Sequence, residues 1–499
     1  MSGTTADTID MVKGILGGGG SEDIAKSITT ANGLVAYDLQ APAKNLYPVV
    51  TPLRNSVPRV GGGTGVATNW RTVTAINGSG FGSMPWIPEG QRSARMSYNT
   101  APKSANYVTI GEEDQVSFES VSAGRTFEDV RATMTVRLLQ KTFLKEEIAI
   151  LGGNASLALG TPGTITTSAS GTGGSLPAAT YGVIVVALSV EGYVQSSVAN
   201  GVATNKSITG ADGNTFTLNG GSSNKSAEVT QVVGAGNTLF ASVPSINGAV
   251  AYAWFIGPAG NETLQAITTI NSVAYSNALI AGTQNISAVT QDSSRNSGLA
   301  FDGLLTTALL PASSAYVNYL PSGTAGTGSY LTASGAGTVV EIDNALKGMW
   351  DNAQLSATVM YVNSQELKNI TKKCLSTSGN APLLQYNNQT ANGQPYKLTA
   401  GGVIAAYFNP YTPDGGRMIP IKLHPNVPPG TILLYAEELP VQYQNNNVSN
   451  VAEVKTRQDY YQIDWPVRTR QYETGVYSEQ VLAVYAPFAM GAILNIANG

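Results

Sequence analysis

The strongest periodic pattern in the chain is helical and lies in "RTFEDVRATMTVRLLQKTFLKEEIAILGG". Thr126 and Asp129 form a capping box at its start, and Gly152 with the following glycine ends it. These signals predict a helix over residues 126–151, which at 1.5 Å per residue is roughly 37 Å long. Its apolar positions recur at three- and four-residue spacing: Phe127, Val130, Met134 and Leu138.

An alternating pattern precedes this helix. "NWRTVTAI" and "SARMSYNTAPKSANYVTI" flank the turn-rich "NGSGFGSMPWIPEGQ", so residues 69–110 are predicted to form a long hairpin. A hairpin of this length contains few core residues of its own. We therefore expect it to lie against something else.

Residues 46–70, "LYPVVTPLRNSVPRVGGGTGVATNW", form a strap that is half apolar and rich in proline. Pro48, Pro52 and Pro58 remove backbone donors and favour extended conformations in the residues before them. The pattern predicts neither a helix nor a central strand here. Residues 1 to about 45 are weakly patterned, with one short helix expected around Ile9 to Leu16, and indicate a mobile terminal arm.

Residues 155–296 contain few charges and several short β-rich runs separated by glycine and asparagine turns. This spacing is typical of a β-sandwich, here inserted into a parent chain. The parent continues with two predicted helices, "TVVEIDNALKGMWDNAQ" and "SQELKNITKKC", each followed by a β-type run, "ATVMYVN" and "TILLYAEEL". The C-terminal segment is strand-like throughout. The fold class expected is therefore α+β.

Composition narrows the functional classes. Charged residues make up 12% of the 499 residues and glycine occurs 55 times, which suits shells, fibres and secreted β-proteins better than cytosolic enzymes. The net charge of −4 does not indicate tight electrostatic binding to nucleic acid. No signal-peptide pattern and no apolar run of membrane-spanning length occurs, so we expect a chain folded in the cytosol.

The sequence contains no convincing catalytic or metal site. Its only histidine, His424, precedes a proline in a turn-rich stretch, and we interpret it as a loop or interface residue. The single cysteine, Cys374, cannot form an intrachain disulfide and is interpreted as a structural thiol. No cofactor motif is present. Adjacent carboxylates are interpreted as solvated faces or helix starts: Glu112, Glu113 and Asp114, Glu146 and Glu147, and Glu437 and Glu438.

The order of elements along the chain resembles that of tailed-bacteriophage major capsid proteins of the Hong Kong coliphage-type fold. The elements are a strap, a hairpin, a long capped helix and a helix-plus-sheet remainder. The resemblance covers residues of about 30 to 154 and 297 to 499. It is carried by "LYPVVTPLRNSVPRV", "WIPEGQ", "FLKEEIAILGG", "FDGL", "NPYTPDGGRMIPI", "PPGTILLY" and "ETGVYSEQVLAVYAPFAMGAILNI". Order and spacing, rather than any single motif, give it specificity.

The resemblance implies a division of the chain into named parts. These are an N-terminal arm (1–64), an extended hairpin called the E-loop (65–115), a spine-helix region (116–154), an inserted immunoglobulin-like domain (155–296), a peripheral domain (297–380), an axial domain (381–464) and a return to the peripheral domain (465–499).

The resemblance also implies a function. Copies of the chain would assemble as hexamers and pentamers into an icosahedral, non-catalytic virion shell around non-specifically held double-stranded DNA, in the cytoplasm of a bacterial host. It further implies separate scaffolding and portal proteins, with no membrane, cofactor or metal. The subunit-interface candidates are the apolar Leu53, Trp70 and Trp86, and the hairpin cations Arg92, Arg95 and Lys103 opposite the anions Glu112, Glu113 and Asp114.

Two other functional classes stay open at this point. A secreted or surface β-rich adhesin would use the inserted sandwich, or the aromatic "MPWIPEG", to bind carbohydrate, although the N-terminus lacks a signal peptide. A hydrolase is disfavoured by the near absence of histidine. For the insert itself we expect a structural knob, with carbohydrate or surface adhesion as the alternative.

Overall fold

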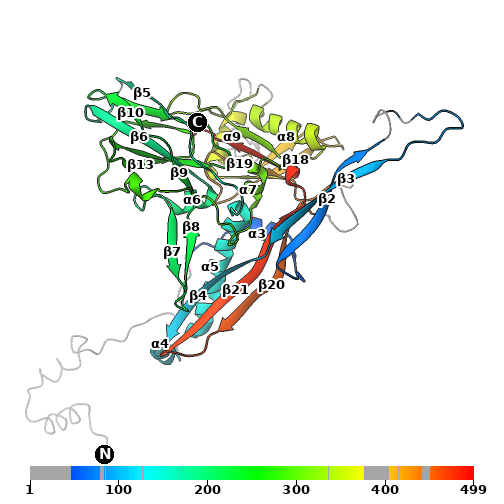
Figure 1. Ribbon diagram of the computed structural model, residues 1–499, viewed down its shortest axis with the longest axis horizontal. Coiled ribbons are helices and arrows are strands. Elements are labelled where there is room, and N and C mark those ends of the chain that lie inside the picture. The colour runs from blue at the N-terminus through cyan, green and yellow to red at the C-terminus, as the bar shows by residue number, and fades with distance from the viewer. Residues whose placement is uncertain are drawn as a thin grey trace, which may run out of the picture.

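The computed structural model describes residues 47–78, 84, 86–125, 128–171, 173–334, 337–375, 404–413, 415–440 and 450–499. The expected helix at Ile9 to Leu16, most of the predicted terminal arm, and residues Thr126 and Phe127 lie outside the described residues. The chain is three-cornered in outline (Figure 1). The inserted β-rich unit forms one corner, a long hairpin the second, and the far end of a long-stranded sheet the third.

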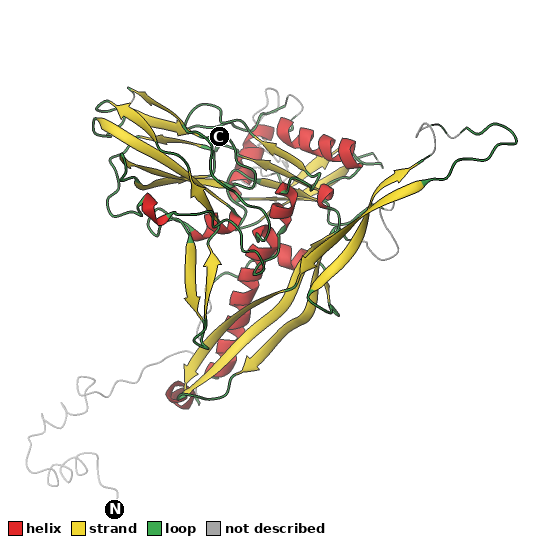
Figure 2. Cartoon of the chain, in the orientation of Figure 1, coloured by secondary structure: helices red, strands yellow, loops and turns green. Residues whose placement is uncertain are grey.

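A long helix, α5 (Val130–Gly152), lies along this sheet (Figure 2). Asp129 caps it by accepting hydrogen bonds from the backbone N–H groups of Arg131 and Ala132, both at 3.1 Å. The predicted spine helix is thus confirmed, but its N-cap is Asp129 rather than Thr126. The four-stranded sheet beneath it has the order β1 (Arg59–Val60), β20 (Ala452–Asp464), β21 (Gln471–Val484) and β4 (Val108–Ser117). A short helix, α4 (Phe118–Gly124), follows β4.

The strap corrects one prediction. It contains a short helix, α3 (Pro52–Ser56), and its strand β1 pairs in parallel with β20, placing Arg59 opposite Val454. Pro52 occupies the first turn of α3, where a backbone donor is not required. Because β1 is an edge strand and begins just after Pro58, the prolines prevent neither element.

The predicted hairpin is confirmed as two antiparallel strands, β2 (Ala67–Asn77) and β3 (Ser97–Asn106). A register shift lies between Val73 and Ala75. The hairpin is shorter than the predicted 65–115, because β4 leaves it and pairs with β21 instead.

A second, six-stranded sheet forms the centre of the remaining parent chain. Its order is β15 (Tyr316–Tyr319), β22 (Met490–Leu494), β19 (Ile432–Tyr435), β16 (Val359–Val362), β18 (Arg417–Leu423) and β17 (Ala406–Asn409). The accompanying helices are α7 (Leu304–Leu309), α8 (Val340–Ala353), α9 (Ser364–Leu375) and the short η3 (Pro487–Ala489). Both helices predicted from the sequence in this region, and the strands after them, are confirmed.

The pairing of strands does not follow the predicted boundaries between parts. The division at 464/465 separates β20 from β21, which are antiparallel partners over their length. The division at 380/381 lies outside the described residues, and β16 before it and β18 after it share one sheet. Both parent sheets thus combine segments from either side of these boundaries, and the predicted peripheral and axial domains stay a prediction.

The insert comprises two antiparallel sheets with a common apolar core. One sheet contains β10 (Val229–Val233), β6 (Ala179–Leu188), β12 (Ala251–Pro258) and β13 (Thr263–Thr268), with β9 (Ser222–Lys225) also paired to β6. The other contains β14 (Ser272–Tyr275), β11 (Thr238–Ser242) and β5 (Thr166–Ser170). A separate hairpin, β7 (Asn205–Thr209) and β8 (Thr215–Asn219), and the short helices α6 (Val190–Gln195) and η2 (Ile286–Ala288) complete it. An all-β unit was predicted; its immunoglobulin-like character stays a prediction.

The insert is joined tightly to the parent. Its entry and exit lie side by side, because Asn296 N–H donates to the carbonyl of Asn154 at 2.8 Å. At a second contact, Asn271 and Asn495 exchange hydrogen bonds of 2.7 and 3.0 Å. Asn495 adopts a left-handed backbone conformation with φ of 63°, which asparagine tolerates better than most residues.

Candidate functional site: the exposed hairpin and the strap clamp

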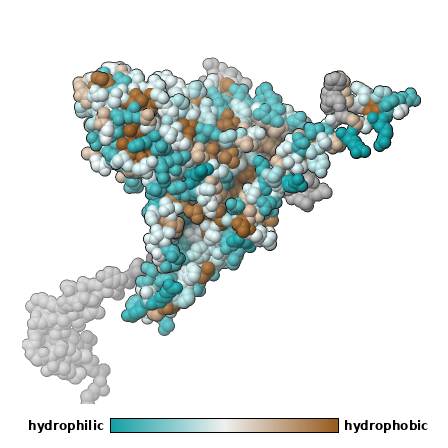
Figure 3. All heavy atoms as spheres, viewed as in Figure 1, coloured by the Kyte–Doolittle hydropathy of each residue, from teal (hydrophilic) through white to brown (hydrophobic). Residues whose placement is uncertain are grey.

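The β2–β3 hairpin extends away from the body (Figure 3), and several of its large apolar side chains are exposed to solvent. Ile76 and Tyr98 are cross-strand partners, and both are exposed. Trp86, beyond the end of β2, is 85% exposed. An isolated two-stranded ribbon is at best marginally stable in water, so the arm needs another surface to cover it. The exposed apolar set is Val73, Ile76, Met84, Trp86, Ile87, Met96 and Tyr98.

The predicted interface charges fall into two groups. The hairpin cations Arg92, Arg95 and Lys103 are exposed. The anions lie on β4 and are engaged within the chain: Glu112 forms an ion pair with Lys145 of α5, and Glu113 accepts a hydrogen bond from the Tyr477 hydroxyl. Asp114 is exposed and accepts from the N–H of the next residue. The structure therefore does not bring the two charged groups together within one chain, and their pairing between copies stays a prediction.

A groove of about 770 Å³ lies at the root of the hairpin, which we call the root groove. Trp70 and Lys103, a cross-strand pair, form one side of it. The Trp70 ring makes an edge-to-face contact with Tyr485 at 5.5 Å. Its indole N–H is buried and has no hydrogen-bond acceptor among the described residues. Trp70 is thus half-buried and lines the groove, and its expected contact with a partner stays a prediction.

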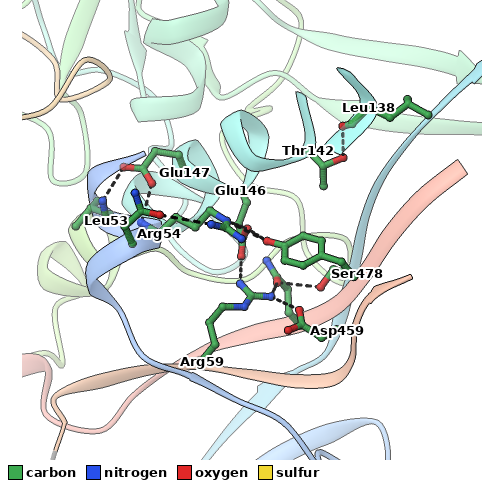
Figure 4. Close-up of polar contacts among 12 residues, drawn as sticks. Leu53, Arg54, Arg59, Leu138, Thr142, Glu146, Glu147, Asp459 and Ser478 are labelled. Carbon is green, nitrogen blue, oxygen red and sulfur yellow. Dashed lines mark hydrogen bonds and ion pairs between the residues drawn. The ribbon is translucent and has the colours of Figure 1, made fainter. Parts of the chain in front are cut away.

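The strap is held on α5 by what we call the strap clamp (Figure 4). Glu146 is buried and accepts hydrogen bonds from the guanidinium groups of Arg54, at 2.9 Å, and Arg59, and from the Tyr460 hydroxyl. The Arg54 guanidinium also stacks 3.6 Å from the centroid of the Phe143 ring. Two strap cations therefore converge on one spine carboxylate.

Electrostatics in the clamp agree with this geometry. Burial and the neighbouring Glu146 carboxylate both raise the pKa of Tyr460 above its ordinary value. Burial alone would lower the pKa of Arg59, but Glu146 and Asp459 beside it raise the pKa overall. The clamp thus favours a charged Arg59 and a neutral Tyr460.

Glu147 forms the second half of the clamp. Its Oε1 accepts from Leu53 N–H at 2.8 Å and lies 2.6 Å from His424 Nε2, while Oε2 accepts from Arg54 N–H at 2.7 Å. The Asn426 N–H donates to His424 Nδ1, so Nε2 carries the hydrogen that points to Glu147. Glu147 therefore caps the N-terminus of α3 from a different helix.

The clamp overturns two interpretations of the sequence. Glu146 and Glu147 are not on a solvated face but 1% and 0% exposed, whereas His424 is a loop residue as expected, although it is buried. Leu53, expected to face a partner, is completely buried in the core of its own chain. One signal for the clamp was available: Leu138, Thr142, Glu146 and Ile150 recur every four residues, which places Glu146 on the buried face of α5.

The remaining candidate groups support no reactive site. Burial raises the pKa of the Cys374 thiol to about 11, which confirms the structural interpretation. No group of three or more metal-ligating side chains occurs within the described ranges. None of the helices in that same part of the chain is both long and apolar enough to span a membrane.

One buried carboxylate is strongly perturbed and escaped the sequence analysis. Burial and the nearby Asp302 raise the pKa of Glu191, on α6, to about 7. Asp302 itself binds the turn at the entry of the insert through the N–H groups of Ala155 and Ser156. Both carboxylates lie where the insert joins the parent.

No family model matches the sequence, and no curated protein matches it. Solved structures similar to the chain include the cyanophage A-1(L) capsid, with 9% identity, a TM-score of 0.43 and coverage of 94% of this chain and 99% of that one. The capsid of a native GTA particle matches with 10% identity, a TM-score of 0.42 and coverage of 94% and 99%. The encapsulin of Synechococcus elongatus matches with 9% identity, a TM-score of 0.40 and coverage of 94% and 95%. Because every one of these TM-scores lies below 0.5, we base the function on the geometry of the chain.

Proposed function

We propose that the chain is a structural shell protein with the Hong Kong coliphage-type capsid fold, namely the major head protein of a tailed bacteriophage. Copies assemble as hexamers and pentamers into an icosahedral capsid around double-stranded DNA. Separate scaffolding and portal proteins take part in assembly, and the insert is an outward decoration of immunoglobulin type. The role is structural and non-catalytic.

The observation that carries this proposal is the exposed apolar hairpin. Ile76, Trp86 and Tyr98 are all more than half exposed on an arm that contacts the body mainly at its root. Burying each apolar side chain of this size contributes about 1.5–3 kcal/mol, and the described residues of the same chain leave these side chains uncovered. A second copy can supply it.

The strap clamp supports the same function. It fixes the strap and α5 to the sheet that contains the hairpin's continuation, β4. The arm therefore projects from a rigid base, and a rigid base reduces the entropy that association must overcome.

Light scattering on a sizing column, combined with negative-stain microscopy, tests the proposal. Rings of five and six subunits, or closed shells, are expected. Shells recovered from infected or expressing bacteria should protect double-stranded DNA from nuclease, whereas protected protein alone would indicate a shell of another kind. A folded monomer at every concentration would contradict the proposal and favour the adhesin.

A further inference from the structure

Three features of the hairpin and its surroundings are left unexplained by self-assembly in general. The hairpin tip, residues 86–96, carries Trp86 and Ile87 in solvent. The root groove lies at the other end of the same hairpin. The Trp70 indole N–H inside the groove is buried without an acceptor in the described part of the chain.

We propose that the hairpin tip of one copy sits in the root groove of the next copy, with Trp86 as the apolar anchor. This inference rests on the proposed self-assembly and names the receptor surface for it. The groove volume of about 770 Å³ lies within the range of roughly 300–1,000 Å³ typical of binding pockets. Phe301 and Phe488 provide apolar walls that suit an inserted indole.

Charges on the two surfaces are complementary. The groove holds one cation, Lys103, and one anion, Asp302. The tip holds one anion, Glu89, followed by two exposed cations, Arg92 and Arg95. In the proposed contact Glu89 is the counter-charge for Lys103, and Arg92 or Arg95 is the counter-charge for Asp302.

The Trp70 N–H explains why the groove favours a peptide rather than a purely apolar ligand. A buried donor without an acceptor costs about 1–3 kcal/mol, and a backbone carbonyl of the inserted segment removes that cost. The tip contains Pro88, which has no backbone N–H, so this part of the segment offers acceptors in excess of donors.

The contact must form between copies. β2 contains 11 residues, which at about 3.4 Å per residue separate its ends by roughly 37 Å. Trp86 lies beyond the distal end of β2, and Trp70 lies near the proximal end. A paired ribbon does not fold back over that distance. Because tip and groove are different surfaces of one chain, the contact is head-to-tail, the kind of contact from which rings are built when the rotation between copies closes.

Two complementary variants test the proposal. Trp86→Ala removes the anchor and leaves the groove, while Ala312→Arg fills the groove at an exposed loop position and leaves the tip. Each variant alone is expected to raise the protein concentration required for ring and shell formation by at least tenfold. An equal mixture is expected to form heterodimers and nothing larger, because one functional tip meets one functional groove.

A matched control and a covalent test separate the outcomes. Val232→Arg, at an exposed position on the insert, should weaken assembly less than threefold. With Cys374→Ser, the pair Ile87→Cys and Ala312→Cys should give a ladder of disulfide-linked chains on oxidation. The tip-in-groove contact would be overturned if Ala312→Arg assembled normally, the mixture formed no heterodimers and the cysteine pair gave no ladder. That set of results would leave the proposed function standing. A wild-type chain that never assembles would overturn both.

Discussion

Glu147→Gln is the sharpest test of the strap clamp, because it changes one atom and almost no volume. Glu147 accepts from three N–H groups, those of Leu53, Arg54 and His424, using both carboxylate oxygens. A glutamine side chain has one acceptor oxygen and one donor nitrogen. In either orientation, its NH₂ group meets at least one of the three donors.

The magnitude follows from these contacts. The orientation that keeps the Leu53 bond loses the Arg54 bond, a charge-assisted interaction of about 1.5–3 kcal/mol. The other two bonds change from charged to neutral, which weakens each by about 1 kcal/mol. A neutral amide is less costly to bury than a carboxylate, which offsets part of the loss. We expect the strap to be destabilised by about 2–4 kcal/mol.

Hydrogen exchange measured by mass spectrometry is the suitable assay because it reports the opening of individual segments. A chain of this size need not unfold in a single two-state transition, so one global free energy of unfolding would not isolate the strap. Peptides that contain the amides of Leu53, Arg54 and Asn55 report local opening of the strap. At 1.4 kcal/mol per tenfold, their protection should fall by about 30- to 1,000-fold. Asp351→Asn, which removes an exposed ion pair with Lys347 on α8, is the control. It should change strap protection by less than about threefold.

Strap protection in Glu147→Gln within threefold of the wild type would refute the reasoning. That result would mean that the apolar burial of Leu53 alone holds α3, and that the three N–H groups find water or other acceptors at little cost. Loss of protection throughout the chain would show a global effect, and a second variant, Arg54→Met, would then separate the Glu146 half of the clamp from the Glu147 half.

Three further predictions follow from single contacts. Cys374, with its pKa raised to about 11, should react with iodoacetamide at pH 8 at least tenfold more slowly in the folded chain than in denaturant; equal rates would contradict its burial. The folded pKa of Glu191, about 7, exceeds its unfolded value, so the native state binds more protons and stability falls as pH rises from about 4.5 to 7. Glu191→Gln should therefore raise the melting temperature at pH 8 and change it little at pH 4.5, and equal shifts at both would argue against titration. Asn271→Ala removes the side-chain oxygen that accepts from the Asn495 amide and the side-chain amide that donates to the Ser322 hydroxyl, and keeps the backbone N–H bond to Asn495. It should increase protease cleavage where the insert joins the parent, whereas Asn205→Ala on the exposed β7 should not.

Elements with a strong local signal could be predicted from the sequence. The spine helix has a regular apolar period and a glycine end, and the hairpin alternates around a turn-rich loop. α8 and α9 are amphipathic over several turns. Each of these patterns lies within one element and does not depend on distant residues.

The strap and the division of the parent could not be predicted, because both depend on distant partners. α3 is five residues long, too short to be stable without the cap that Glu147 provides from 94 positions away. Adjacent carboxylates such as Glu146 and Glu147 usually mark a solvated surface, and only the positions of Arg54 and Arg59 make burial favourable. The root groove likewise combines the hairpin with β21 and the loop after α7.

The clamp also sets a time at which the strap becomes fixed. Arg59 in the strap binds Asp459, which lies 400 residues later, and Arg54 binds Tyr460. At about 5–20 residues per second, a ribosome needs roughly 20–80 s to synthesise that interval. During this period β1 and the arginines have no β20 to bind. The strap can bind Glu146 and Glu147 of α5 earlier, but its contacts with β20 stay unmade on every chain that ends before Asp459. A completed clamp therefore marks a chain that has been synthesised through β20.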